Sequence, residues 1–229
     1  MALIAVNDLT FTYPGSYDPI FEHVSFRIDT DWKLGLTGRN GRGKTTLLKL
    51  LMGEYAFSGS IVSTVRFAYF PYPVADKSRS TQEVLETICP GLIYWQLVRE
   101  LSELQVAEDT LRRPFNTLSN GEQTKVMLSV MFLKENSFLL IDEPTNHLDA
   151  EGRSAVSRYL KSKKGYIVVS HDRAFLDGCV DHILSINRSD IEVVQGNFSS
   201  WMENKRRQDA FELSQNERLK KDIRRMEKA

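Results

Sequence analysis

Apolar residues near the start of the chain alternate with polar ones, a pattern typical of antiparallel strands. The segments 9–13 and 24–28 both show this alternation, and the turn at 13–16 separates them. Two further strands are expected at 60–62 and 67–70. The first part of the chain therefore predicts a layer of antiparallel strands.

The middle of the chain changes from this alternation to helical spacing. Between 80 and 112 the apolar positions recur three or four residues apart, at Val84, Leu85, Ile88, Leu97, Leu101 and Leu104. From 119 to 187, helical stretches alternate with near-continuous apolar runs at 138–141 and 166–169. Such runs are typical of parallel strands whose sheet is covered by helices on both faces. The pattern predicts an α/β fold.

The last section, 203–229, has nine Lys/Arg against six Asp/Glu and neither Gly nor Pro. Its apolar residues fall at roughly helical spacing, which predicts a long charged helix that projects from the domain. No capping signal ends it, so we expect the helix to continue beyond residue 229.

Composition narrows the class of protein. The 229 residues have a formal net charge of zero, so no global field attracts nucleic acid or anionic membrane. Two cysteines, Cys89 and Cys179, lie in unrelated contexts and are expected to be reduced thiols. No apolar run approaches 18 residues, and the first residues lack the pattern of a signal peptide. We expect a cytoplasmic protein that neither spans a membrane nor is exported.

A glycine-rich loop of the form G-x-x-x-x-G-K-[ST] lies between a strand-like run at 34–36 and a helix-like run at 46–52. It comprises Gly38, Arg39, Asn40, Gly41, Arg42, Gly43, Lys44, Thr45 and Thr46. Glycines let backbone amides turn toward phosphate oxygens, and the helix N-terminus favours anions. Lys44 is expected to reach the β- and γ-phosphates, and Thr45 to offer its hydroxyl to Mg²⁺. The loop predicts a nucleotide site rather than an ordinary glycine turn.

The apolar run at 138–141 ends in two carboxylates, Asp142 and Glu143. A buried strand that ends in a carboxylate beside a phosphate loop can hold Mg²⁺, which Thr45 and Asp142 would share directly or through water. Glu143 is then placed to take a proton from an attacking water. Acidic strand ends are also common without function, but the neighbouring phosphate loop favours the catalytic interpretation.

Two further segments have both a structural and a functional interpretation. Ser119 with Glu122 three residues later predicts a capping box at the start of an amphipathic helix, and by itself this segment favours the structural role. His171 follows the apolar run at 166–169. A lone histidine is usually structural, but one at the tip of a parallel strand near a Mg²⁺ site can sense a terminal phosphate.

In this order and spacing, the phosphate loop and three motifs resemble a nucleotide-binding domain of the ATP-binding cassette (ABC) superfamily. The motifs are LSNGEQ at 118–123, FLLIDEPTNHLD at 138–149 and VSHD at 169–172. The resemblance covers about residues 3–200. It implies a P-loop NTPase fold with an antiparallel β subdomain and a small helical subdomain at about 76–133. It also implies that two such domains enclose two ATP molecules head to tail.

The family implies a role for each matching position. Tyr13 would stack on adenine, residues 38–46 would hold the phosphates, and Asp142 with Thr45 would bind Mg²⁺. Glu143 and His171 would be the catalytic residues, the first acting on water and the second switching with the γ-phosphate.

A second set of positions would serve the ATP of the partner domain. The loop at 146–149 would cross the dimer, and the γ-phosphate of the partner would be capped by the signature residues Ser119, Asn120, Gly121 and Glu122. A helix N-terminus with a hydroxyl and free amides is suited to this task.

The sequence departs from the family pattern at two positions. Asn120 replaces a signature glycine; asparagine tolerates positive φ better than other non-glycine residues, so we expect the turn to persist with weaker phosphate contact. Tyr72 stands where the family has a metal-contacting glutamine, and it offers a hydroxyl instead of an amide oxygen. Slow hydrolysis is expected from both changes.

Three features resemble the ABC-F group in particular. They are PTNHLD at 144–149, the short stretch between Tyr72 and Ser119, and GNFSSW at 196–201 before the charged helix. This resemblance implies two cassettes on one chain and binding to the ribosome. The segments 31–36 and 173–175 are most similar to members that confer resistance to ribosome-targeting antibiotics. On this basis residues 1–200 form the first cassette and 201–229 the start of an inter-domain linker.

The sequence is also consistent with two other classes of protein. An ATPase subunit of a membrane transporter would need a surface for transmembrane partners and no projecting helix. An ATP-dependent clamp with negligible turnover would fit Asn120 and Tyr72, whereas Glu143 favours turnover. If the second cassette lies elsewhere on the full-length chain, the fragment 1–229 is expected to be a monomer and a poor ATPase.

Overall fold

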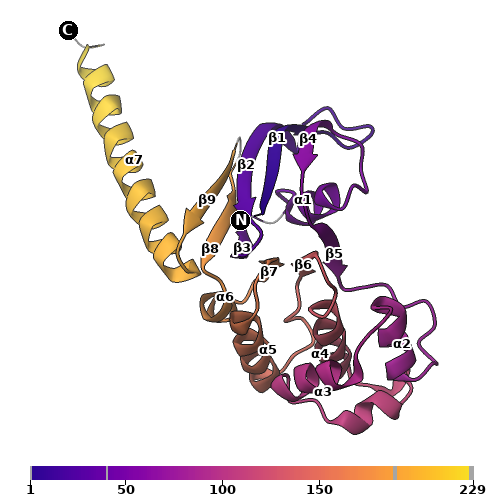
Figure 1. The fold of residues 1–229 in the computed structure, drawn as a ribbon. Helices are drawn as coiled ribbons and strands as arrows, with labels where there is room; N and C mark the ends of the chain where they lie inside the picture. The colour runs from indigo at the N-terminus through magenta and orange to yellow at the C-terminus, as the bar shows by residue number, and fades with distance from the viewer. Residues whose placement is uncertain (1, 40, 188–189, 227–229) are drawn as a thin grey trace.

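The computed structural model describes residues 2–39, 41–187 and 190–226, which form two sheets, a helical lobe and a long projecting helix (Figure 1). The predicted α/β class is confirmed. The antiparallel sheet lies at one end of the molecule and the helical lobe at the other, with the larger sheet between them.

The antiparallel sheet has the order β2-β1-β4 and consists of β1 (Leu3–Phe11), β2 (Phe21–Asp29) and β4 (Ser58–Val62). The alternation predicted at 9–13 and 24–28 is confirmed within β1 and β2. However, β1 begins at Leu3 and ends at Phe11, so Tyr13 lies in the loop between the two strands and not in a strand.

The larger sheet contains the apolar runs of the middle of the chain. Its order is β5-β6-β7-β3-β8-β9, formed by β5 (Arg66–Phe70), β6 (Ser137–Asp142), β7 (Tyr166–Val169), β3 (Lys33–Thr37), β8 (His182–Ile186) and β9 (Ile191–Gln195). All pairs are parallel except β8 with β9. The parallel order places the carboxyl ends of β3, β6 and β7 at one edge, where loops that bind ligands occur in such sheets.

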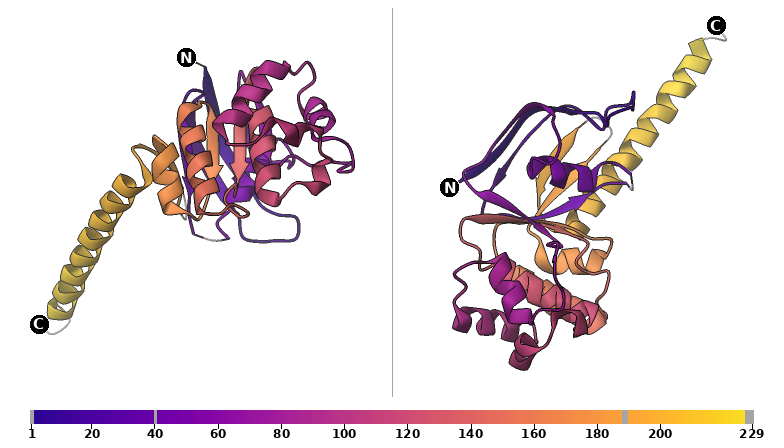
Figure 2. Two further views of the ribbon diagram at one scale, coloured as in Figure 1. Left: turned by 90° about the horizontal axis from the view of Figure 1, so that it is seen from below. Right: turned by 90° about the vertical axis from the view of Figure 1, so that its right-hand side faces the viewer.

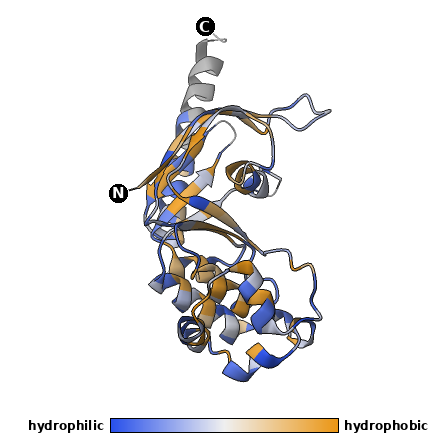
Figure 3. Cartoon of the chain, turned by 45° about the vertical axis from the view of Figure 1, so that its right-hand side comes forward, coloured by the Kyte–Doolittle hydropathy of each residue, from blue (hydrophilic) through white to orange (hydrophobic). Residues whose placement is uncertain are grey.

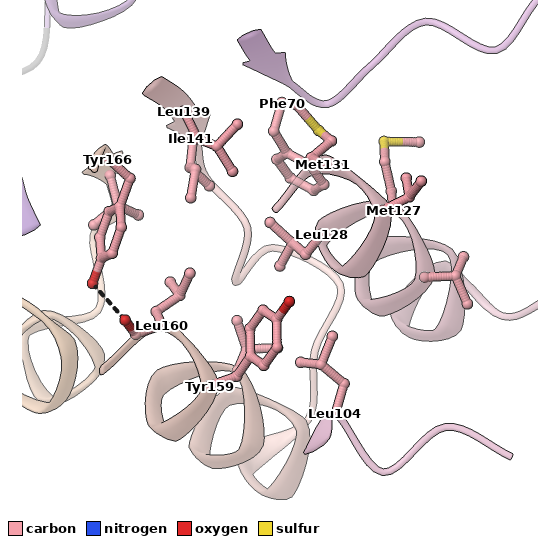
Figure 4. Packing of buried hydrophobic residues seen from close by; sticks show 14 of the residues in the cluster. Phe70, Leu104, Met127, Leu128, Met131, Leu139, Ile141, Tyr159, Leu160 and Tyr166 are labelled. Atoms are coloured by element: carbon pink, nitrogen blue, oxygen red, sulfur yellow. Dashed lines mark hydrogen bonds between the residues drawn. The ribbon is translucent and has the colours of Figure 1, made fainter. Parts of the chain in front are cut away.

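Both faces of the larger sheet are buried, which explains the near-continuous apolar runs. Leu140 and Ile167 face the antiparallel sheet and helix α1 (Lys44–Leu51), whereas Leu139, Ile141 and Val168 face the opposite cluster. Figure 4 shows this opposite cluster, where β6 and β7 side chains meet those of the covering helices. Colouring by hydropathy shows the same apolar interior in the helical lobe (Figure 3).

The helical lobe follows β5, as the segment 80–112 predicted. It contains α2 (Thr81–Ile88), α3 (Tyr94–Glu103), the 3₁₀ turns η1 (Glu108–Arg112) and η2 (Phe115–Thr117), and α4 (Asn120–Met131). Ser80 with Glu83 and Ser119 with Glu122 form complete capping boxes at α2 and α4. Each box satisfies backbone N–H groups that a helix N-terminus leaves unpaired.

The remaining helices are α5 (Ala150–Ser162), α6 (Arg173–Cys179) and α7 (Phe198–Met226). Asp149 and Asp172 cap α5 and α6, each accepting a backbone N–H three residues ahead. In every view, α7 extends away from the body of the domain (Figure 2). It begins at Phe198, which is buried, and Trp201 and Met202 also pack on the core. The first turn of the projecting helix is thus part of the domain.

Both cysteines are free thiols, as expected. Within the described residues, no helix is both long enough and apolar enough to cross a membrane.

Candidate functional site

The glycine-rich loop connects β3 to α1 at the carboxyl edge of the larger sheet. Gly41 and Gly43 have φ values of +77° and +86°, which disfavour any residue with a Cβ. A Cβ on Gly43 would also lie 2.6 Å from Cγ2 of Ile20. Asn40, predicted to contact phosphate, lies outside the described residues. The loop therefore has the backbone conformation that phosphate binding requires. The backbone angle and the contact with Ile20 exclude a larger residue at position 43.

Lys44 is the first residue of α1, and its side chain turns back over the loop. Its Nζ donates to the carbonyl oxygens of Gly38 at 3.0 Å and Arg39 at 3.5 Å. The ammonium group thus lies above the same loop whose amides would face a phosphate. An oxyanion bound there would meet a cation and a helix N-terminus together.

Asp142, at the end of β6, lies next to Thr45. Its Oδ2 accepts from the Thr45 hydroxyl at 2.9 Å and from the Tyr69 hydroxyl, also at 2.9 Å. Burial and the charge of Asp142 raise the pKa of the Tyr69 phenol, so this group stays a hydrogen donor. Tyr69 was not predicted from the sequence. The strand that carries it pairs with β6, but only the folded sheet places its hydroxyl on Asp142.

The donor set around Asp142 fits Mg²⁺. A carboxylate and a hydroxyl are oxygen ligands, and Mg²⁺ commonly takes one or two carboxylates together with nucleotide phosphates and water. Among the described residues, no group of three or more His, Cys, Asp and Glu side chains could hold a metal ion by itself. An ion here would depend on the phosphates of the nucleotide.

Glu143 follows Asp142 with a φ of +50°, a left-handed conformation that is strained for a glutamate. Its N–H donates to the carbonyl of Val169 at 3.0 Å, which joins the ends of β6 and β7. Both carboxylate oxygens are buried without a hydrogen-bond partner, and burial raises the pKa of this carboxyl above its ordinary value. A strained carboxylate whose oxygens accept no hydrogen bond, at the end of a strand, is suited to bind a water and accept its proton.

His171 lies beside Glu143. Its Nε2 is 3.3 Å from Oε1 of Glu143, and the imidazole is mostly exposed. The adjacent Ser170 hydroxyl is within 2.9 Å of the Thr145 hydroxyl, so the turns after β6 and β7 are connected twice. The structure therefore brings together the loop, Asp142, Glu143 and His171, as predicted.

Tyr13 lies close to the phosphate loop, in the segment between β1 and β2. Its hydroxyl shares a hydrogen bond of 2.8 Å with Thr46, and its ring meets the rings of Phe11 and Tyr55 edge-on. The residue is 37% exposed. A flat base could therefore pack on this ring near the phosphate loop.

The predicted signature residues lie in a separate cavity of about 670 Å³. Ser119, Asn120, Gly121 and Glu122 line it together with His147, Leu148 and Asp149. The Ser119 hydroxyl accepts from the N–H of Glu122 at 3.2 Å, and the Glu122 carboxylate accepts from the N–H of Ser119 at 2.8 Å. The structural interpretation of this pair is thus confirmed. None of the described residues of the loop, 38–39 and 41–46, lines this cavity.

Asn120 and Tyr72, the two departures from the family pattern, lie in the helical lobe and beside it. Asn120 is the first residue of α4 and does not have positive φ, so the turn persists without a left-handed residue there. Tyr72 packs on the side of the helical lobe: its N–H donates to Sδ of Met127, and Nζ of Lys134 lies 5.7 Å from its ring centroid. Tyr69, three residues earlier, is the phenol that contacts Asp142.

A phosphate loop before a helix, a carboxylate at the end of β6, one strand removed from β3 in the sheet, and a glutamate directly after it define a P-loop NTPase domain. Comparison with known proteins specifies the family: the family described as "ABC transporter" matches residues 21–146. The chain belongs to this family of ATP-binding cassettes, whose members hydrolyse ATP.

Relatives support the predicted likeness to the ABC-F group. The chain is 32% identical over 206 residues to "ABC transporter F family member 3" of Arabidopsis thaliana, covering 87% of this chain and 29% of that protein. It is 30% identical over 213 residues to "Putative ATP-binding protein YdiF" of Bacillus subtilis, covering 90% and 33%. It is 29% identical over 249 residues to "Energy-dependent translational throttle protein EttA" of Escherichia coli, covering 89% and 45%. The chain therefore spans between about a third and a half of these relatives.

A solved structure agrees in fold. The structure titled "Structure of a bacterial Atm1-family ABC exporter with ATP bound" matches with a TM-score of 0.72 and 16% identity, covering 89% of this chain and 40% of that chain. The predicted cassette fold is confirmed.

Proposed function

We propose that the chain is one cassette of an ABC-F protein that binds Mg·ATP, hydrolyses it together with a second cassette, and acts on the ribosome. The observation that carries the ATPase part is the Glu143 carboxylate, which is buried without a hydrogen-bond partner near Lys44 and Asp142 at one sheet edge. A carboxylate buried in this way lowers the stability of the folded protein, which is expected of a residue kept for catalysis rather than for stability.

The residues divide the chemistry among themselves. The amides of the loop and Lys44 would hold the β- and γ-phosphates, and Tyr13 would pack on adenine. Asp142 and Thr45 would hold Mg²⁺, which supplies charge neutralisation at the phosphates. Glu143 would accept the proton of the attacking water, and His171 would contact the γ-phosphate next to it.

The signature residues Ser119, Asn120, Gly121 and Glu122 would serve the nucleotide of the second cassette. Supporting this, they line a cavity of their own together with residues 147–149, apart from the phosphate loop. The domain boundaries that we propose are 1–200 for the cassette and 201–229 for the start of the linker, with the first turn of α7 packed on the cassette.

The ribosome part of the proposal rests on the relatives named F family members and translational throttle protein, and on the charged helix α7. Within that group, we propose that the protein acts in the cytoplasm. Its role there is either in translation or in the protection of ribosomes against antibiotics. A transporter subunit is less well supported because α7 leaves the domain as a long charged helix.

Co-sedimentation of the full-length protein with ribosomes tests this function. Glu143→Gln removes the base but keeps the size of the side chain, so ATP should trap this variant on ribosomes. Lys44→Ala is the matched control, because it should not bind ATP and should stay in the supernatant. An equal distribution of both variants, with ATP binding verified for Glu143→Gln, would contradict the proposal.

The fragment 1–229 tests the need for a second cassette. With Mg·ATP at tens of micromolar protein, light scattering should give a monomer, and ATP turnover should stay below about 1 s⁻¹, the low end of the ordinary enzyme range. A stable wild-type dimer with faster turnover would show that a second copy completes the site.

A further inference from the structure

Arg153, in the first turns of α5, contacts both of the turns that follow β6 and β7. Its Nε donates to the carbonyl oxygen of Leu148 at 3.1 Å, and its Nη1 donates to Oδ2 of Asp172, also at 3.1 Å. Leu148 belongs to the loop 146–149 after β6. Asp172 directly follows His171 in the turn after β7. One side chain therefore connects the loop proposed to serve the second cassette with the turn that carries the histidine.

The Asp172 carboxylate is held from two sides. Its Oδ1 accepts the N–H of Phe175 at 3.0 Å, which caps α6, while its Oδ2 pairs with Arg153. The N–H of Phe175 and the Arg153 guanidinium keep the pKa of Asp172 below its ordinary value, so the carboxylate is charged at neutral pH. On the other side of His171, the Ser170 hydroxyl accepts the N–H of Asp172 at 3.1 Å. The residues on both sides of the histidine are therefore fixed by hydrogen bonds.

The other acceptor of Arg153 lies against the start of α4. Leu148 lines the same cavity as Ser119 and Gly121. A Cβ on Gly121 would lie 3.3 Å from the carbonyl oxygen of His147 and 3.5 Å from Cδ2 of Leu148, so the helix approaches this loop closely. A shift of the Leu148 carbonyl would therefore change the surroundings of the signature residues.

Arginine is suited to hold two acceptors at a fixed distance from each other. Its guanidinium is planar, so Nε and Nη1 belong to one rigid fork, whereas a lysine has a single ammonium nitrogen on a flexible chain. The ion pair with Asp172 is partly open to solvent, with the Arg153 side chain 44% exposed, and such pairs contribute little to stability. The contact therefore supplies geometry to the site rather than stability to the fold.

We propose that Arg153 is a positioning residue for ATP hydrolysis. Through Asp172 it sets the place of the turn that carries His171. Through Leu148 it sets the place of the loop 146–149. Arg153 does not itself line the cavity of the signature residues, so its effect passes through its two acceptors. The inference rests on the proposed function, because it assigns a role in that reaction.

Steady-state ATPase assays of the full-length protein test this role, with kcat divided by the fraction of protein that binds a non-hydrolysable ATP analogue. Arg153→Gln removes the charge and the rigid fork, and this corrected kcat should fall about ten-fold or more, because small misplacements of reacting groups slow a reaction strongly. The KM for ATP should change by less than about two-fold, since no contact with the bound nucleotide is lost. Arg153→Lys keeps the charge and should recover part of the loss.

Arg158→Gln is the matched control for these assays. Arg158 is exposed on the same helix, and its side chain has no hydrogen bond or ion pair within the described part of the chain. The corrected kcat of this variant should stay within about two-fold of the wild type, as is usual for surface substitutions. A corrected kcat of Arg153→Gln equal to that of the control would overturn the proposal.

A double-mutant cycle shows whether the effect passes through Asp172. Asp172→Asn keeps an oxygen that can cap α6 and removes the charge that pairs with Arg153. Because both changes break the same contact, the double variant should lose about as much corrected kcat as Arg153→Gln alone. Losses that multiply would show that the two residues act independently and would overturn the proposal.

A spectroscopic readout separates this role from the proposed function. In the nucleotide-free protein, Arg153→Gln should shift the imidazole NMR resonances of His171, which are assigned by their loss in His171→Ala. Arg158→Gln should leave these resonances in place. Unshifted resonances in Arg153→Gln would overturn the proposal. Shifted resonances in a protein that binds the analogue without turnover would support the positioning role and contradict the proposed ATPase function.

Discussion

Replacing Glu143 by glutamine should stabilise the nucleotide-free protein, although the same change should remove catalysis. Both carboxylate oxygens of Glu143 are buried and lack a hydrogen-bond partner, and the side chain is only 20% exposed. Nε2 of His171 is 3.3 Å from Oε1, but the imidazole is 66% exposed, so solvent screens its effect. The pKa of Glu143 is raised because the cost of burial outweighs the favourable effects of His171 and Lys44. The folded state therefore keeps a poorly compensated negative charge.

The magnitude follows from the cost of an unsatisfied buried acceptor, which is about 1–3 kcal/mol and larger when the group is charged. Glutamine leaves the same positions unpaired but neutral, so the difference is the charge-dependent part, about 1 kcal/mol. For a domain of this size, such a gain raises the melting temperature by about 2–4 °C. The backbone strain at position 143 is present in both proteins, so it cancels from the difference between their free energies of unfolding.

Thermal and urea unfolding at neutral pH, without nucleotide and with a chelator, would measure this gain. Glu135→Gln is the matched control, because Glu135 is exposed and its neutralisation should change stability by less than about 0.5 kcal/mol. A Glu143→Gln variant as stable as the wild type, or less stable, would refute the reasoning that the carboxylate is uncompensated.

Three further predictions concern binding and pH. Lys44→Ala should weaken ATP about ten- to a hundred-fold by calorimetry, because a charge-assisted contact contributes about 1.5–3 kcal/mol; an unchanged dissociation constant would exclude the assigned loop. Tyr69→Phe removes a donor to Asp142 and should raise the Mg²⁺ concentration for half-maximal Mg·ATP binding several-fold, while ATP binding in chelator stays the same; unchanged Mg²⁺ dependence would show that Tyr69 does not position the carboxylate. Burial raises the pKa of the Cys179 thiol to about 12, so the folded state keeps a proton that the unfolded state loses above about pH 8.5, and the free energy of unfolding should fall by up to about 1.4 kcal/mol per pH unit above that point. The urea midpoint of Cys179→Ala should fall less between pH 9 and 10 than that of the wild type.

Local sequence rules predicted most of the elements correctly. The capping box predicted at Ser119 begins α4. The caps at Ser80, Asp149 and Asp172 were not predicted, although they too depend only on residues three positions apart. The apolar runs predicted the central strands because a strand covered on both faces needs apolar residues on both. Strands β8 and β9 were not singled out, since their boundaries depend on pairing with β3 and with each other.

The sequence by itself determined the ligand class of the loop at 38–46, because positive φ at Gly41 and Gly43 and the following helix are local properties of that segment. Only the tertiary structure decided what surrounds the loop. The Tyr69 contact to Asp142 spans 73 residues of sequence, and the burial of Glu143 depends on the neighbouring strand end. The loop residue Gly38 and Trp201 of α7 likewise line one cavity although they lie far apart in the sequence. Such contacts arise from strand order and helix packing, which no short stretch of sequence encodes.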